Sequence, residues 1–160
     1  MTEKNPKIVR AGSGLERQAA PGETLVFKLT GDDSGGTLDY IVLTVAPNVG
    51  PPLHLHHFRE ETFHITKGRF KLRIGDDTTI CETGDFAYIP SGTPHAFLNI
   101  SNEPAEFIAV YTPGGGEKFF EEFGPMMESS APDQEEVAAL MEKHGITLLG
   151  PPLSEDQPEE

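Results

Sequence analysis

Two histidines and a glutamate stand close together between Gly50 and Gly68, in the segment GPPLHLHHFREETFHITKG. Successive side chains of a β-strand point to opposite faces, so His54 and His56 should share one face, with their imidazoles about 6 to 7 Å apart. Glu61 follows His56 by five residues, an odd spacing that would place it on the other face of an unbroken strand. We therefore expect a turn between residues 57 and 60, after which Glu61 faces inward.

A further ligand is available in a second segment, GDFAYIPSGTPHAFLN, where His95 follows a turn and opens another strand-like run. Three neutral imidazoles and one carboxylate suit a divalent first-row metal ion, namely Fe, Ni, Mn, Co, Cu or Zn. The sequence thus predicts one such ion bound by His54, His56, Glu61 and His95. Two alternatives stay open. A His-x-His pair also occurs on ordinary surfaces, and Glu60 could replace Glu61 if the turn were altered.

Together the two segments resemble the two sequence motifs of the cupin superfamily. The first motif has His-x-His, a spacer, Glu, six residues and Gly; the second has Gly, Pro-x-Gly, His and Asn at fixed spacings. The matching residues are His54, His56, Glu61 and Gly68, then Gly84, Pro90, Gly92, His95 and Asn99. Gly50 departs from the pattern because it stands nearer to His54 than the motif requires, but it is a turn position and not a ligand. The resemblance implies an all-β, cupin-type antiparallel β-barrel, also called a double-stranded β-helix or jelly roll.

Length and charge limit the possible partners. The 160 residues fall within the usual range of a single domain, and 12 basic against 26 acidic residues give a net charge of −14. Phosphate backbones and anionic membranes would repel this surface, so we expect neither nucleic acid nor membrane as a partner. The single cysteine, Cys81, excludes an internal disulfide and indicates a cytoplasmic protein. No apolar run predicts a signal peptide or a membrane span.

Turn residues divide the chain into parts. We expect an N-terminal arm over 1–23, the barrel over 24–112, a short helical extension over 113–149 that packs on the barrel, and an acidic, disordered tail over 150–160. Within the barrel, seven to nine short strands with turns between them favour an antiparallel architecture. The extension should contain helices over 117–123 and from Asp133, an N-cap, to Gly145. These helices could be ordinary packing elements or a lid over the barrel mouth.

Three histidines and one glutamate leave one or two coordination positions open, which is the arrangement of a catalytic site. Residues 61–70 resemble the corresponding strand of quercetin 2,3-dioxygenases, and the expected interior is apolar. We therefore predict a metal-dependent, quercetinase-like dioxygenase acting on a small flat or aromatic, or enediol, substrate, with Glu61 as both ligand and proton acceptor. The alternatives are an oxygen-independent isomerase, cyclase or lyase acting on a secondary metabolite, and a non-catalytic cupin that binds a small ligand.

A homodimer is also predicted. Sheet edges tend to be covered, and Ile8 and Val9 of the N-terminal arm have no place to pack within one chain. Cupins commonly dimerise by exchanging N-terminal strands, so the resemblance implies the same assembly.

Overall fold

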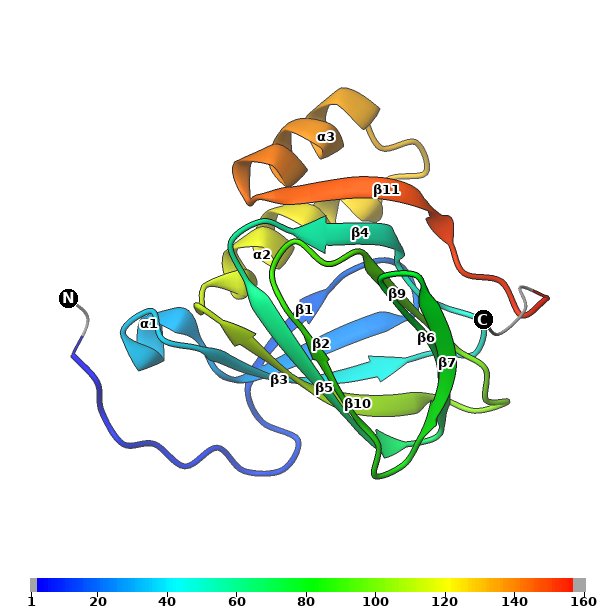
Figure 1. Cartoon of the computed structure of the whole chain (residues 1–160). Helices are drawn as coiled ribbons and strands as arrows, with labels where there is room; N and C mark the ends of the chain where they lie inside the picture. The colour runs from blue at the N-terminus through cyan, green and yellow to red at the C-terminus, as the bar shows by residue number, and fades with distance from the viewer. Residues whose placement is uncertain (1–2, 157–160) are drawn as a thin grey trace.

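Two antiparallel sheets face each other and enclose the core (Figure 1). The structure is a computed structural model and describes residues 3–156. One sheet has the order β1-β2-β3-β10-β5-β8, formed by Leu15–Gln18, Glu23–Leu29, Asp39–Val45, Ala105–Thr112, Glu60–Lys67 and Phe86–Ile89. The other has the order β11-β4-β9-β6-β7, formed by Ile146–Pro152, Pro52–His56, His95–Asn99, Arg69–Ile74 and Asp77–Glu82. The predicted antiparallel all-β fold is confirmed.

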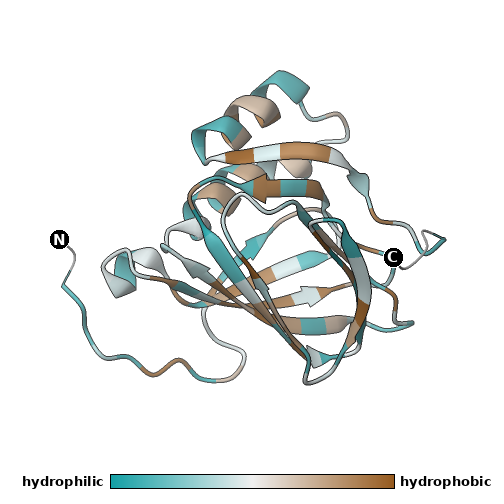
Figure 2. Cartoon of the chain, viewed as in Figure 1, coloured by the Kyte–Doolittle hydropathy of each residue, from teal (hydrophilic) through white to brown (hydrophobic). Residues whose placement is uncertain are grey.

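Alternation along the strands decides which side chains enter the core. In β10, the residues Ala105, Phe107, Ala109 and Tyr111 are buried, and the residues between them are partly exposed. The strand lies between β3 and β5, and both pairings are antiparallel. Hydrophobic and hydrophilic bands follow one another along several strands (Figure 2). One face of each strand therefore supplies the wall of the interior.

Four phenylalanines from both sheets meet at the centre of the core. The ring centroid of Phe107, on β10, lies 4.6 Å from that of Phe63, 5.0 Å from that of Phe97 and 5.2 Å from that of Phe70. The rings are tilted or edge-on, an arrangement that contributes about 0.5–1.5 kcal/mol per pair beyond the burial of area. Because Phe63 and Phe97 belong to opposite sheets, this cluster holds the two sheets together.

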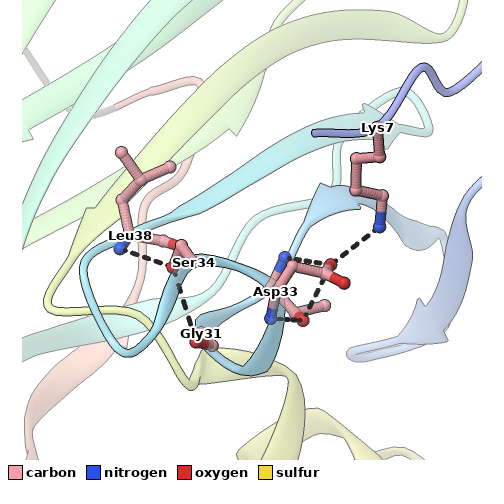
Figure 3. Close-up of polar contacts among 6 residues, drawn as sticks. Lys7, Gly31, Asp33, Ser34 and Leu38 are labelled. Carbon is pink, nitrogen blue, oxygen red and sulfur yellow. Dashed lines mark hydrogen bonds and ion pairs between the residues drawn. The ribbon is translucent and has the colours of Figure 1, made fainter. Parts of the chain in front are cut away.

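The N-terminal arm is tied to a single helical turn, α1 (Gly31–Ser34). The Thr30 hydroxyl accepts a hydrogen bond from the Asp33 amide, and the Asp33 carboxylate accepts one from the Thr30 amide. Lys7 Nζ lies 2.8 Å from the same carboxylate, as Figure 3 shows. The arm also contains β1, an edge strand that pairs with β2.

Two helices follow the last barrel strand. The first is longer than the sequence indicated, and the second begins at the predicted N-cap. Helix α2 (Gly116–Met127) begins close to the predicted start but continues through Pro125. Helix α3 (Gln134–Lys143) has the predicted N-cap, since the Asp133 side chain accepts from the amides of Glu135 and Glu136. Phe119 of α2 and Leu140 of α3 are buried in one apolar cluster with Ile146 of β11.

The C-terminal segment departs from the prediction. Residues 150–152 were expected to lie in a disordered tail, but they belong to β11, which pairs antiparallel with β4. Leu153 is buried, and the Lys71 side chain donates to the carbonyls of Ser154 and Glu155. The Gly-Pro-Pro sequence is tolerated because β11 is an edge strand whose register shifts at those residues. Residues 157–160 of the predicted tail lie outside the described residues.

Gly50 is required by the close approach of β9 to the loop before β4. A Cβ atom at this position would lie 1.8 Å from the carbonyl oxygen of Phe97, a backbone atom that cannot rotate away. We expect Gly50→Ala to lower the free energy of unfolding by about 3 kcal/mol or more, measured by denaturant titration. Gly150→Ala is the matched control, because the nearest atoms to its Cβ would be Leu53 side-chain atoms at 3.7 and 3.8 Å. Equal losses in the two variants would contradict this account.

Among residues 3–156, no helix is long and apolar enough to cross a membrane. The homodimer concerns a second chain and stays a prediction. Ile8, which the prediction placed at the partner, is 83% exposed in the single chain.

Candidate metal centre

Three histidines converge inside the barrel mouth. His54 and His56 lie on β4, and His95 is the first residue of β9, directly opposite His54 in the antiparallel pairing. The ligand nitrogens that they offer all lie within 4.8 Å of one another. The alternation of β4 therefore brings both of its histidines to one face, as predicted, and the turn before β9 brings the third.

Hydrogen bonds hold two of these imidazoles in one orientation. His54 Nδ1 lies 2.8 Å from the carbonyl oxygen of Pro52, and His95 Nδ1 lies 2.9 Å from that of Thr93. Because a carbonyl only accepts, each Nδ1 must donate its proton, which leaves Nε2 with a free lone pair. This tautomer is the one that a metal ion needs, and backbone carbonyls commonly fix it at metal sites.

Glu61 is the carboxylate that faces the histidines. It is 3% exposed; its Oε2 lies 2.5 Å from His95 Nε2 and its Oε1 lies 3.5 Å from His56 Nε2. Its rival, Glu60, is exposed. The turn expected between residues 57 and 60 separates β4 from β5, and it brings Glu61 inward.

The electrostatics keep His54, His56 and Glu61 in the forms that bind a metal ion, whereas His95 is shifted toward its protonated form. Burial lowers the pKa of His54 to about 3 and also lowers the pKa of His56, so both imidazoles are neutral at pH 7. Burial alone would raise the pKa of Glu61, but His56 and His95 outweigh it and hold that pKa below its usual value. Burial likewise would lower the pKa of His95, but the Glu61 carboxylate outweighs it and raises that pKa.

These residues fit a divalent cation. The raised pKa of His95 favours a proton between His95 Nε2 and Glu61, and a bound cation would take the place of that proton. Glu61 Oε2 is buried and meets the geometry of a hydrogen bond with none of residues 3–156, although His95 Nε2 is close to it. Three neutral imidazoles and an ionised carboxylate are the donor set that first-row divalent ions prefer. The three histidines could therefore hold a metal ion, with Glu61 beside it.

A cavity of about 250 Å³ opens onto this cluster, and all four residues line it. Barrel residues such as Phe63 and Phe97 form its inner part. The C-terminal segment forms another wall, with Phe119 and Phe123 of α2 and Ile146 of β11. The cavity has the predicted apolar lining. The helical extension forms part of its wall, next to the site.

Tyr111 and Arg59 also line the cavity, although neither was among the predicted site residues. Tyr111 is buried, its ring centroid lies 6.2 Å from that of His56, and its pKa is raised by burial and then by the Glu61 charge. The guanidinium carbon of Arg59 lies 5.6 Å from the Tyr111 ring centroid, and Arg59 Nε donates to the Pro113 carbonyl. Only the inward alternation of residues 105–112 could have indicated Tyr111, and nothing local indicated Arg59.

The remaining histidines near the site face elsewhere. His57 and His64 are both exposed, and His57 Nε2 lies 2.7 Å from the Thr147 hydroxyl. Neither side chain therefore belongs to the histidine cluster.

Comparison with protein families supports the reading of this site. Residues 41–111 match the family described as a cupin domain, and this range contains all four site residues. Residues 41–111 form a cupin domain. The two motifs singled out in the sequence therefore belong to the family whose fold the two sheets adopt.

This cupin domain has relatives of several kinds. The chain is 28% identical over 95 residues to "Quercetin 2,3-dioxygenase" of Bacillus subtilis (strain 168), an alignment that covers 59% of this chain and 28% of that protein. Among solved structures, KdgF from Halomonas sp. has a TM-score of 0.64 at 12% identity and covers 71% of this chain and 99% of its own. The polyketide cyclase RemF from Streptomyces resistomycificus has a TM-score of 0.59 at 22% identity, over 68% and 80%. At these identities the structures show the fold alone.

Proposed function

We propose that this cupin is a metal-dependent dioxygenase that opens a small flat substrate, a flavonol or a related enediol. One divalent first-row ion would be held by His54, His56, His95 and Glu61. The observation that carries the proposal is the position of the donor set, at the end of a largely apolar cavity of about 250 Å³. A planar aromatic molecule fits walls made of phenylalanine and leucine side chains, whereas a sugar would leave its hydroxyls without partners there.

The residues of the chain would divide the work as follows. When bound, the metal ion would supply Lewis-acid and redox chemistry. Glu61 would accept the proton of a substrate hydroxyl, because it lies among the ligands and its lowered pKa keeps it ionised and unprotonated before the substrate binds. The apolar wall from α2 and β11 would exclude water from the reacting ring. Tyr111, buried beside Glu61, would help to orient the carboxylate.

The relative from Bacillus subtilis supports this class of substrate, since its name states a quercetin dioxygenase. The chain spans only about a quarter of that protein, 28%, so the activity of the whole relative is carried here as a proposal.

Oxygen uptake tests the proposal. Metal-replete protein is mixed with a flavonol and with simple enediols in an oxygen electrode, and substrate loss is followed by absorbance in the same cell. We expect one dioxygen molecule to be consumed for each substrate ring opened. Turnover that persists under argon would instead identify an oxygen-independent isomerase, cyclase or lyase. Tight binding without turnover in either gas would identify a ligand-binding cupin.

A further inference from the structure

A second buried carboxyl lines the same cavity, on the sheet that carries no histidine of the cluster. Glu23 is the first residue of β2 and points to the same face as the buried Leu25 and Phe27. It is 5% exposed, and it lines the cavity together with His54 and Glu61. A carboxyl group at this depth needs a reason, because burying an unpaired polar group costs about 1–3 kcal/mol.

One oxygen of this carboxyl is left without a partner in the described part of the chain. Glu23 Oε1 is buried and has no hydrogen-bond partner among residues 3–156. Burial raises the pKa of Glu23 to about 7, and neither the histidine cluster nor any other charged group contributes to the shift. Burial alone therefore accounts for the raised pKa of Glu23.

The comparison with Asp39 shows what a structural carboxylate looks like in this protein. Asp39 is fully buried, but its two oxygens accept hydrogen bonds from the amides of Gly115 and Gly116, at the start of α2. Those bonds account for its burial. Nothing comparable accounts for Glu23, although the residue lines the cavity.

We propose that Glu23 is a ligand-recognition residue that hydrogen-bonds a hydroxyl group on a neutral, aromatic ligand in this cavity. This inference rests on the proposed function for the class of substrate. It adds to that substrate a second polar group, the hydroxyl that binds Glu23. The metal centre would take one end of the ligand, and Glu23 would select for a hydroxyl elsewhere on it.

A hydroxyl fits this position better than an amine does. A protonated carboxyl both donates and accepts, so it can satisfy both functions of one hydroxyl. A cationic ligand would share the cavity with the Arg59 guanidinium and with the bound metal ion, and both would repel it. The apolar walls give such a cation no further partner.

Binding of naphthol and naphthalene tests the inference. The two probes have the same flat shape and differ by one hydroxyl, and neither carries a chelating pair of oxygens. Naphthol fluorescence can be followed because the chain has no tryptophan. The zinc-loaded protein is titrated with each probe about one pH unit below the pKa of Glu23, where the carboxyl is protonated.

We expect wild-type protein to prefer naphthol by about three- to tenfold, the size of one neutral hydrogen bond. Glu23→Leu should abolish this preference while retaining binding of naphthalene. Glu23→Gln should keep most of it, because an amide also donates and accepts. Glu103→Gln removes an exposed carboxylate that does not line the cavity and should change nothing.

Two results would overturn the inference: an unchanged preference in Glu23→Leu, or no preference in the wild-type protein. Loss in Glu23→Gln equal to that in Glu23→Leu would contradict the account of the contact as one made by a neutral donor and acceptor, because the amide also donates and accepts. None of these outcomes depends on dioxygen. A failure of oxygen uptake with the naphthol preference intact would therefore reject the proposed reaction and keep the role of Glu23.

Discussion

Protein in which His54, His56 and His95 are all replaced by alanine is expected to contain no stoichiometric metal. The three side chains supply every imidazole within reach of the site, and Glu61 alone would be a single buried carboxylate without a partner. Each single replacement by alanine should also cost most of the metal occupancy, because the remaining ligands leave an additional open position. The measurement is elemental analysis of protein purified without an affinity tag, since a polyhistidine tag would bind metal itself.

The matched control for this experiment is the double variant His57→Ala and His64→Ala. Both residues are exposed and neighbour the site in sequence, so the variant removes two histidines without entering the cluster. It should retain the metal content of the wild type. Unchanged metal in the triple variant would place the binding site elsewhere in the protein.

The second large effect is expected at Glu61. We predict that Glu61→Gln keeps the fold and appreciable metal, while turnover falls by roughly a hundredfold or more, the usual consequence of losing a general base. The amide has nearly the same shape as the carboxylate, and its oxygen can still coordinate weakly. It cannot accept a proton at neutral pH. Steady-state turnover is measured on samples whose metal content has been matched to that of the wild type.

Glu60→Gln is the control, because Glu60 is the adjacent residue and points outward. Its turnover should be unchanged. Full activity in metal-replete Glu61→Gln protein would show that this carboxylate is a ligand or a structural group and not the base. Loss of metal along with activity would be separated from loss of the base by the metal analysis.

Much of the barrel could be predicted, and so could the face of the strand on which each site residue lies, because both follow from local rules. Strand alternation is set by the backbone, so the shared face of His54 and His56 is visible in sequence. The odd spacing to Glu61 indicated the turn that β4 and β5 now flank. The motif around His95 contains its own turn residues. These signals need no knowledge of distant parts of the chain.

Features that depend on distant contacts were missed. The Gly-Pro-Pro sequence of β11 is typical of a loop, and only its pairing with β4 makes it a strand. From the sequence, Glu23 is an ordinary polar residue at the end of a strand. It is buried in a cavity that residues of α2 and α3 also line. Arg59 enters the cavity through contacts with Pro113 and Tyr111, more than 50 residues away. No periodicity in the sequence reports such contacts.

The pairing of β11 with β4 links the end of the chain to the metal centre. Ile146 lies opposite His56 and Leu148 lies opposite His54, so the strand that carries two of the three imidazoles is flanked on one side by the C-terminal strand. If β11 positions β4 for binding of the proposed ion, each of the two events would strengthen the other by the same factor. A truncation or a fusion at the C-terminus that weakens β11 would consequently be felt as a loss of affinity for the ion.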